Sequence, residues 1–245
     1  MTSQDVINNL QLLANKEKAE LCKRFFKTLK GQYSEGDLFL GINVPIVKEI
    51  AKKYKDLELN HIETLLNSPM HEIRQCALAI LVIQFERLAK KAEENEEKLR
   101  LLLSFYLSHS TKANNWDLVD MSAPKILGRW LVLNLDSKTE KLKIMNSLAE
   151  SKNLWQERIS VVACQTPIKE KDFSWILTFG TKQIKHSHDL MHKALGWMLR
   201  EMGKMDKEVL LSYLEEHYKD LSRTSLRYSI ERFEKSEREY WLKRK

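Results

Sequence analysis

The chain has 245 residues, of which 43% are hydrophobic and 31% charged, enough for one sizeable core or one array of packed repeats. Its 7 glycines and 4 prolines are too few for a turn-rich β protein, and its 3 dispersed cysteines lack the spacing of a zinc knuckle or disulfide framework. With 41 basic and 34 acidic residues the net charge is +7, which favours a polyanionic partner if the positive charge gathers on one face.

Apolar residues recur with the helical period along nearly the whole chain, and two-residue alternation typical of strands is absent. We predict helices at residues 3–13, 16–30, 45–55, 59–67, 70–91, 95–109, 115–121, 124–134, 138–149, 153–166, 170–178, 187–203, 206–217 and 223–235. Pro45 stands early in its helix with Asn43 as a candidate cap, and Gly203 is expected to close the helix that contains Trp197.

Four of these helices share a plan in which a basic residue accompanies a ridge of small and apolar residues. The basic positions are Arg74, Arg158, Lys193 and Arg227, at intervals of 84, 35 and 34 residues. The first interval equals two spacings of about 42, and periods of about 34 to 45 indicate a HEAT-type α-solenoid. We therefore predict one all-α superhelical domain over residues 1–245 with a basic concave face. Scattered surface salt bridges are the alternative for these charges.

The most unusual segment is Trp116-Asp117-Leu118-Val119-Asp120. On a helix Trp116 and Asp120 are neighbours on one face, and a carboxylate beside an indole acts strongly on a nearby cation. The alternative is a core tryptophan with Asp117 or Asp120 capping the helix or pairing with Lys125.

Two further tryptophans stand beside cations, since Trp197 follows Lys193 by four residues and Trp155 precedes Arg158 by three. Such pairs suit stacking on a base or sugar together with phosphate pairing, although large aromatic residues in helices also form cores. The common nucleotide-binding, serine-hydrolase and zinc-protease motifs are missing. His188 and His192 are one turn apart without a third ligand, so we expect no metal site and no cofactor.

Taken together, these segments resemble the AlkD-type DNA alkylation-repair glycosylases, over about residues 35 to 235. The matching segments are Phe39–Pro45 (FLGINVP), Asn115–Asp120 (NWDLVD) with Gly128, Trp155–Arg158 (WQER), Lys193–Glu201 (KALGWMLRE) and Arg223–Tyr228 (RTSLRY). Departures are Asn115, where some members have a second tryptophan, and Val44, where a hydroxyl residue can contact DNA.

The resemblance implies a HEAT-like superhelix that removes cationic N3- and N7-alkylpurines from duplex DNA without a metal. It implies that Asp120 is the catalytic carboxylate, that Trp116 and Trp197 contact the sugar and backbone at the lesion, and that Arg158 holds a phosphate. The remaining DNA-binding candidates are Arg74, Lys193, Arg227, Asn43, Lys48 and Trp155.

Two other functions stay open, a DNA-binding repeat scaffold without catalysis and a protein-binding HEAT module. The first five residues show no basic region followed by an apolar stretch, and the longest apolar run, Ala77 to Ile83, is too short to span a bilayer. We expect a monomeric cytoplasmic protein, or a nuclear one in a eukaryote, with no membrane partner.

Overall fold

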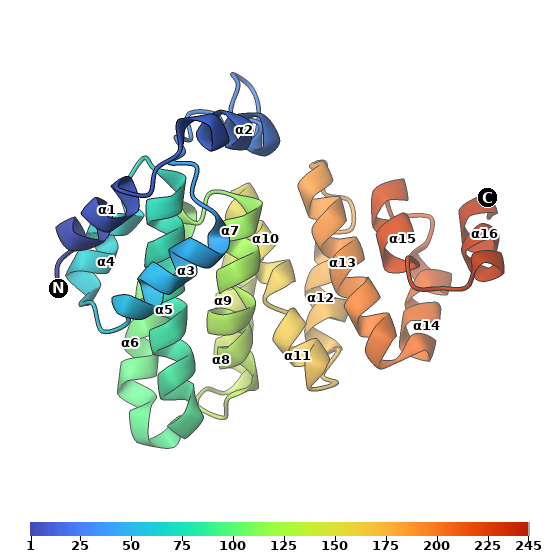
Figure 1. Ribbon diagram of the computed structural model, residues 1–245. Coiled ribbons are helices and arrows are strands. Elements are labelled where there is room, and N and C mark those ends of the chain that lie inside the picture. Colours follow the sequence, from blue (N-terminus) through green and yellow to red (C-terminus); the bar gives the residue numbers. More distant parts are fainter. Residues whose placement is uncertain (245) are drawn as a thin grey trace. The chain divides into compact units, whose positions relative to one another are not determined.

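A computed structural model describes residues 1–244, and over that range the regular secondary structure is helical apart from one isolated parallel bridge between Leu38 and Met70 (Figure 1). Its contacts divide the chain into two compact units, Met1–Ser122 and Ala123–Lys245, called here the N-terminal and C-terminal units. The predicted all-α class is confirmed.

The N-terminal unit is organised around one long central helix. Its helices are α1 (Ser3–Gln11), α2 (Lys16–Phe26), α3 (Val44–Lys53), α4 (Leu59–Leu66), α5 (His71–Leu88), α6 (Glu96–Ser108) and α7 (Trp116–Ser122), with 3₁₀ turns at Ala89–Lys91, Glu93–Asn95 and Ser110–Lys112. Helix α5 packs against α3, α4, α6 and α7 and is buried along most of its length, as expected of a helix that is apolar nearly all round. It therefore forms the core of this unit.

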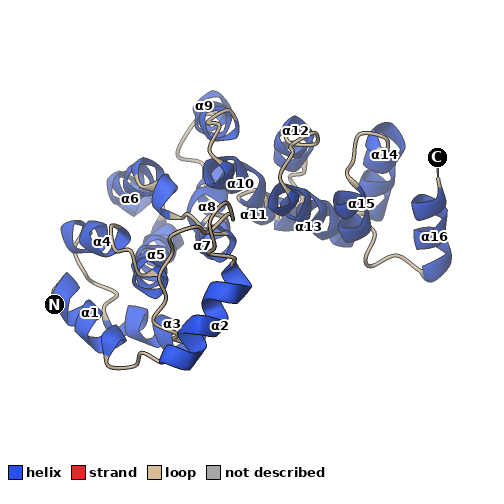
Figure 2. Cartoon of the chain, turned by 90° about the horizontal axis from the view of Figure 1, so that it is seen from above, coloured by secondary structure: helices blue, strands red, loops and turns tan. Residues whose placement is uncertain are grey.

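The C-terminal unit is a stack of helix pairs. It contains the π-helix η4 (Pro124–Gly128) and α8 (Arg129–Val132), α9 (Lys138–Ala149), α10 (Leu154–Val162), α11 (Gln165–Lys169), α12 (Ser174–Lys182), α13 (Asp189–Met205), α14 (Lys207–His217), α15 (Arg223–Ser229) and α16 (Lys235–Lys243). Figure 2 shows α9, α12 and α14 in one layer and α10, α13 and α15 in the other. Since α10 packs on α13 and α13 on α15, Arg158, Lys193 and Arg227 fall on successive helices of one layer. The predicted helical repeat is confirmed within this unit.

Local capping explains where many helices begin. The Thr2 and Ser137 hydroxyls accept from the third backbone N–H of α1 and α9, and Asp5 and Glu140 complete the two capping boxes. Asn43 does occupy the cap position of α3, but its side chain makes no capping hydrogen bond. The start of α3 therefore depends on Pro45 and on packing.

Several predicted boundaries were wrong, because packing overrides local signals. The predicted helix 124–134 is divided into η4 and α8, and the helix 153–166 ends at Val162, before the separate α11. Helix α12 lies about one turn later than predicted, and α16 was missed.

Gly203 does not end its helix, because α13 continues to Met205. A Cβ atom at Gly203 would lie 2.3 Å from the Leu210 Cδ2 atom, so this glycine lets α14 approach closely. It is a packing residue rather than a helix terminator.

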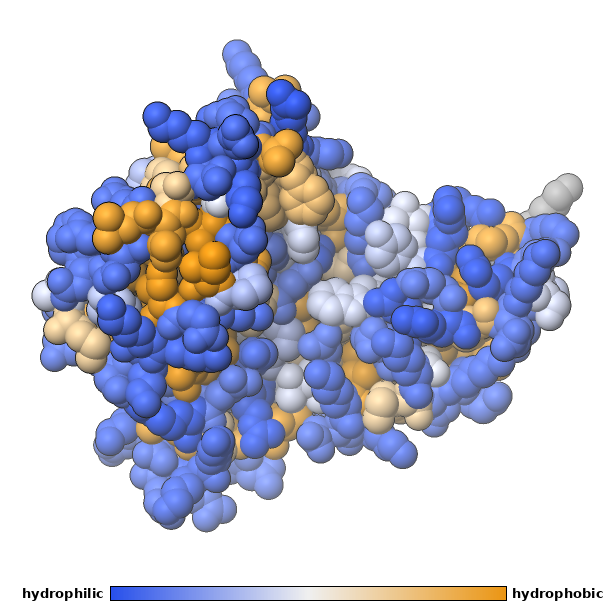
Figure 3. All heavy atoms as spheres, viewed as in Figure 1, coloured by the Kyte–Doolittle hydropathy of each residue, from blue (hydrophilic) through white to orange (hydrophobic). Residues whose placement is uncertain are grey.

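Two properties concern the surface, namely the length and apolarity of the helices and the distribution of exposed apolar side chains. Within residues 1–244, no helix combines the length and apolarity needed to cross a membrane. Figure 3 shows apolar surface gathered over the N-terminal unit. Exposed apolar side chains there include Leu12, Leu21, Phe25 and Leu29, which are 84%, 63%, 65% and 72% exposed. This unit therefore exposes apolar groups as well as charges.

Candidate functional site

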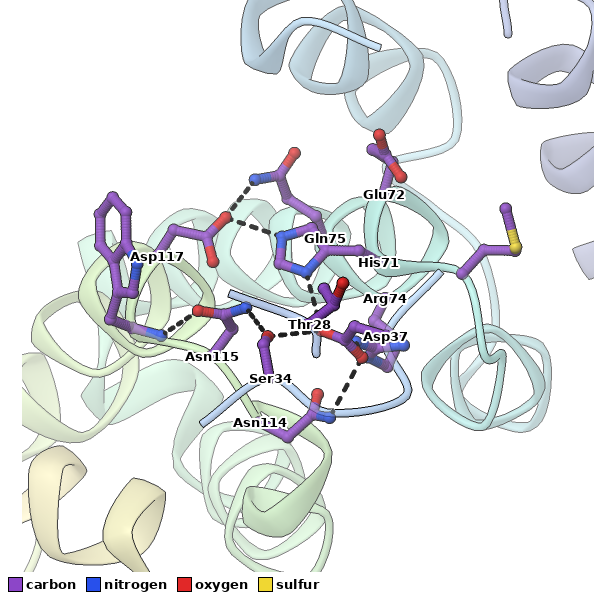
Figure 4. Close-up of polar contacts among 12 residues, drawn as sticks. Thr28, Ser34, Asp37, His71, Glu72, Arg74, Gln75, Asn114, Asn115 and Asp117 are labelled. Atoms are coloured by element: carbon purple, nitrogen blue, oxygen red, sulfur yellow. Dashed lines mark hydrogen bonds and ion pairs between the residues drawn. The ribbon is translucent and has the colours of Figure 1, made fainter. Parts of the chain in front are cut away.

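The first turn of α7 is fixed by Asn115. Its side chain is fully buried, and its Oδ1 accepts a hydrogen bond from the backbone N–H of Trp116 at 2.8 Å. The Asn115 Nδ2 donates to the Ser34 hydroxyl at 2.6 Å, and that hydroxyl donates to Asp37 at 3.3 Å. Asparagine at this position therefore caps the helix and ties it to the loop before α3 (Figure 4).

The second anchor of α7 is Asp117, whose carboxylate turns toward α5. Its Oδ2 lies 2.9 Å from the His71 Nε2 and accepts from the Gln75 Nε2 at 3.0 Å. Asp117 therefore does not depend on Lys125, the partner offered by the alternative above. Trp116 and Asp120, one helical turn apart, are both partly exposed. The carboxylate engaged with α5 and the carboxylate beside Trp116 are thus two different residues.

Arg74 is part of the same buried network. Its guanidinium is 4% exposed, donates from Nη2 to the Asp37 Oδ1 at 2.6 Å, and donates from Nη1 to the Ser68 carbonyl at 2.9 Å. The expectation that Arg74 presents its charge on an open basic face is therefore wrong. A buried guanidinium needs a carboxylate partner, and the loop before α3 supplies one.

An aromatic cluster covers this network. The Phe26 ring of α2 lies 5.6 Å from the Trp116 ring, 5.2 Å from the Phe39 ring and 5.0 Å from the His71 imidazole, measured between ring centroids. Phe25 meets Trp116 edge to face at 6.1 Å. These contacts hold α2 beside the start of α7.

The FLGINVP segment is built around Glu72, which is only 2% exposed. The Glu72 carboxylate accepts from the backbone N–H groups of Leu40, Gly41 and Ile42 at 2.8, 2.8 and 3.2 Å. Gly41 has a φ of +77°, and a Cβ there would lie 2.2 Å from the Asn15 carbonyl oxygen. This motif is therefore structural, since it joins the start of α2, the start of α3 and α5.

In the C-terminal unit, two predicted DNA contacts are buried. Trp155 is 8% exposed and Arg158 is 4% exposed, and the Arg158 Nη1 donates to the Leu190 carbonyl near the start of α13. Their helix, α10, packs against α9, α12 and α13, which leaves little of it open. The expectation that Trp155 and Arg158 lie on an open surface is therefore wrong.

The other predicted residues are more accessible. Lys193 is 41% exposed and its ammonium lies 2.8 Å from the Asp189 carboxylate, one turn earlier on α13. Trp197 is half-buried, and Arg227 is exposed. In the N-terminal unit, Asn43 and Lys48 are exposed at the start of α3.

The glycine of the KALGWMLRE segment serves helix packing. A Cβ at Gly196 would lie 2.5 Å from the Tyr228 Cβ and 2.6 Å from the Ser225 carbonyl oxygen. The Ser225 hydroxyl donates to the His192 carbonyl at 2.9 Å. Helices α13 and α15 are therefore in close contact, and the motif places Trp197 next to that contact.

The histidines before α13 have structural partners. The His186 Nε2 lies 3.0 Å from the Glu157 carboxylate, and the His188 Nδ1 accepts from the Leu190 N–H at the start of α13. Burial and the neighbouring His186 lower the pKa of His188, which suits a neutral capping side chain. Across the described chain, no three or more His, Cys, Asp or Glu side chains are grouped to hold a metal ion.

The buried polar residues Asp37, His71 and Gln75 were not predicted. One sequence signal did mark two of them, because His71, Glu72, Arg74 and Gln75 stand directly before the apolar run Ala77 to Ile83. Polar residues at that place must find buried partners. Their partners lie far away in sequence and could not be named.

The fold and these contacts define an all-α helical-repeat protein. In one unit a capped Trp-Asp helix lies beside a buried charge network, and in the other basic residues recur on stacked helices. The family model of DNA alkylation repair enzymes matches residues 6–233, and the chain belongs to that family. The resemblance found from the sequence motifs is thus confirmed at the level of the family.

A solved structure described as a predicted DNA alkylation repair enzyme from Enterococcus faecalis is similar to this chain, with a TM-score of 0.69 and 19% sequence identity. The similarity covers 91% of this chain and 97% of that one, and at this identity it supports the fold alone. No curated protein matches the sequence.

Proposed function

We propose that this DNA alkylation repair protein is a monofunctional DNA glycosylase that hydrolyses the N-glycosidic bond of cationic N3- and N7-alkylpurines in duplex DNA. The observation that carries the proposal is the different placement of the two aspartates of α7. Asp117 holds α7 to His71 and Gln75, and Asp120, which is itself partly exposed, stands one turn after the partly exposed Trp116. An indole and a carboxylate on one helical face suit a positively charged reacting centre.

The chemistry needs little beyond these two groups. Alkylation at N3 or N7 makes the purine cationic, so the base takes the C1′–N electron pair and leaves neutral without acid catalysis. The sugar becomes oxocarbenium-like, and a fixed carboxylate stabilises that charge and orients the attacking water. Water adds to C1′ and loses its proton to the carboxylate or to solvent. No lysine nucleophile is required, so no lyase step is expected.

DNA binding in this proposal uses the accessible predicted residues Lys193, Trp197 and Arg227, together with Asn43 and Lys48. Exposed cations near a phosphate backbone supply most of the sequence-independent affinity. Arg158 contributes differently from the expectation, by holding the Leu190 carbonyl at the start of α13, three residues before Lys193. The protein is proposed to act as a cytoplasmic monomer on duplex DNA, without a cofactor.

The test is release of free alkylated base from methylated duplex DNA under single-turnover conditions. Asp120→Asn keeps the size of the side chain and removes its charge, so the rate should fall by about two to three powers of ten, or about 3 to 4 kcal/mol. DNA affinity should change little, because a carboxylate does not bind phosphate.

The matched control is Asp56→Asn, which removes an exposed carboxylate paired with Arg87 in the same unit. It should leave the rate unchanged. An Asp120→Asn rate within a few-fold of the parent rate would rule out Asp120 as the catalytic carboxylate, and a parent protein that releases no base would favour the DNA-binding scaffold.

A further inference from the structure

His71 is a buried group of the N-terminal unit that joins two carboxylates. It is 2% exposed, with its Nε2 2.9 Å from the Asp117 Oδ2 and its Nδ1 3.4 Å from the Asp37 Oδ2 (Figure 4). Ionised carboxylates only accept hydrogen bonds, so each ring nitrogen must carry a proton to engage both. With both carboxylates ionised, the geometry therefore fits an imidazolium.

The charges around His71 balance only in that state. Asp37 and Asp117 carry two negative charges and Arg74 one positive charge, so a protonated His71 makes this set of four side chains neutral. A buried cluster with an uncompensated charge is strongly disfavoured.

The neighbouring polar groups Gln75, Glu72 and Cys22 add no positive charge. Gln75 donates to Asp117, Glu72 on α5 is occupied by the amides of residues 40–42, and Cys22 on α2 has a pKa raised by burial. The Phe39 ring stacks on the imidazole at 4.8 Å, with Phe26 at 5.0 Å, and both contacts favour a cation. Burial opposes the charge, but the hydrogen bonds to Asp117 and Asp37 raise the pKa of His71 from 6.5 to about 9.

Two chains of contacts run from Asp37 to α7. One passes through Ser34 and Asn115 to the Trp116 backbone, and the other passes through His71 to the Asp117 carboxylate. Helix α7 has only 7 residues, which is too short to be stable by itself. Its orientation, and with it the direction of Trp116 and Asp120, therefore depends on these anchors.

We propose that His71, as an imidazolium bridging Asp37 and Asp117, is a positioning residue that holds α7 so that Trp116 and Asp120 meet the DNA lesion. The proposal rests on the glycosylase function stated above. His71 is too buried to touch DNA, so it acts through Asp117. Losing its proton removes the His71 hydrogen bond to one of the two carboxylates and the positive charge between them, which loosens the hold on α7. Catalysis by Trp116 and Asp120 therefore has an alkaline limit set by His71.

The decisive measurement follows Trp116 and His71 in the same titration. The chain has 6 tryptophans, so 5-fluorotryptophan labelling gives a small set of fluorine signals, and Trp116→Phe identifies the one from Trp116. This signal and the His71 imidazole proton signal should move together, with a midpoint near the pKa of about 9. In Asp117→Asn both midpoints should fall by about one to three pH units, because an opposite charge has been removed.

Asp56→Asn is the control, since it removes an exposed carboxylate of the same unit, and both midpoints should stay in place. A His71 midpoint at or below the ordinary histidine pKa of 6.5 overturns the proposal. A Trp116 signal that does not change as His71 titrates also overturns it. If Asp117→Asn does not fold, the wild-type titration alone decides.

Base release supplies the catalytic readout. At neutral pH, Asp117→Asn should slow single-turnover release by about ten- to a hundredfold at unchanged DNA affinity, as expected when reacting groups are misplaced. Unchanged release overturns the positioning role. A wild-type protein that releases no base disproves the glycosylase function, whereas the two magnetic resonance titrations still decide whether His71 holds α7.

Discussion

The two units hold their candidate residues by different physical means. In the N-terminal unit, α7 is anchored by buried charges and amides, including Asp37, His71 and Arg74. In the C-terminal unit, α13 is anchored by close backbone contact with α15 at Gly196. Ionic anchors respond to pH and to removal of one partner, whereas steric anchors respond to added volume. The units should therefore fail under different perturbations.

The largest stability effect is expected from Glu72→Ala in the N-terminal unit. Three buried N–H groups would lose their acceptor, and each unsatisfied donor costs about 1 to 3 kcal/mol, so the free energy of unfolding should fall by at least about 3 kcal/mol. Urea denaturation followed by circular dichroism measures this change. Glu49→Ala, at a 70% exposed carboxylate on α3, should change it by less than about 0.5 kcal/mol. Equal effects of the two variants on the free energy of unfolding would contradict the structural role assigned to Glu72.

A smaller loss is expected from Gly196→Ala in the C-terminal unit. The new methyl group would overlap the backbone of Ser225 and the Cβ of Tyr228, which should cost about 1 to 3 kcal/mol. Gly180→Ala is the comparison, because a Cβ there meets only the flexible side-chain ends of Leu195 and Ile176. Its cost should be largely offset by the better helix propensity of alanine, worth about 1 kcal/mol. Gly180→Ala as damaging as Gly196→Ala would show that the α13–α15 contact is not special.

The pH dependence of stability should separate the two units. Burial opposes ionisation of Asp37, but the hydrogen bond from His71 and the charge of Arg74 lower its pKa below the ordinary 3.8. A depressed carboxyl pKa contributes stability above the ordinary value, and that stability is lost as the pH falls through the folded value. Asp37→Asn should therefore flatten the loss of unfolding free energy between about pH 5 and about pH 2.

Asp189→Asn, which removes a more exposed pair with Lys193, should change the acid profile less. A steeper acid effect from Asp189 than from Asp37 would contradict the comparison.

The smallest expected effect is a change in DNA binding, not in the stability of the fold. Arg227→Met should reduce the slope of log Kd against log salt by about one unit, as for one phosphate contact. Arg74→Met should leave the slope unchanged and destabilise the fold, because its guanidinium is buried against Asp37. Fluorescence anisotropy with duplex DNA at several salt concentrations measures both slopes. A lower slope for Arg74→Met would mean that Arg74 reaches phosphate after all.

Helical periodicity, capping residues and repeat spacing were sufficient to predict an all-α repeat protein and most of its helices. The start of α7 at Trp116 and the starts of α4, α9 and α14 were predicted to within a residue, because capping and apolar spacing act over a few neighbouring positions. Motif resemblance then identified the family. Capping and periodicity depend on residues close together in the chain, and a motif is a run of consecutive residues, so the sequence contains both signals.

Burial was decided only by the tertiary structure. Arg74 and Arg158 are in the positions that the repeat predicts, and Trp155 stands three residues before Arg158, yet all three are turned into the units instead of onto an open face. Arg74 pairs with Asp37 across 37 residues, and His71 bridges Asp37 and an aspartate 46 residues beyond itself. Whether a charge faces solvent or a partner depends on which distant segment packs beside it, and helical periodicity carries no information about that segment.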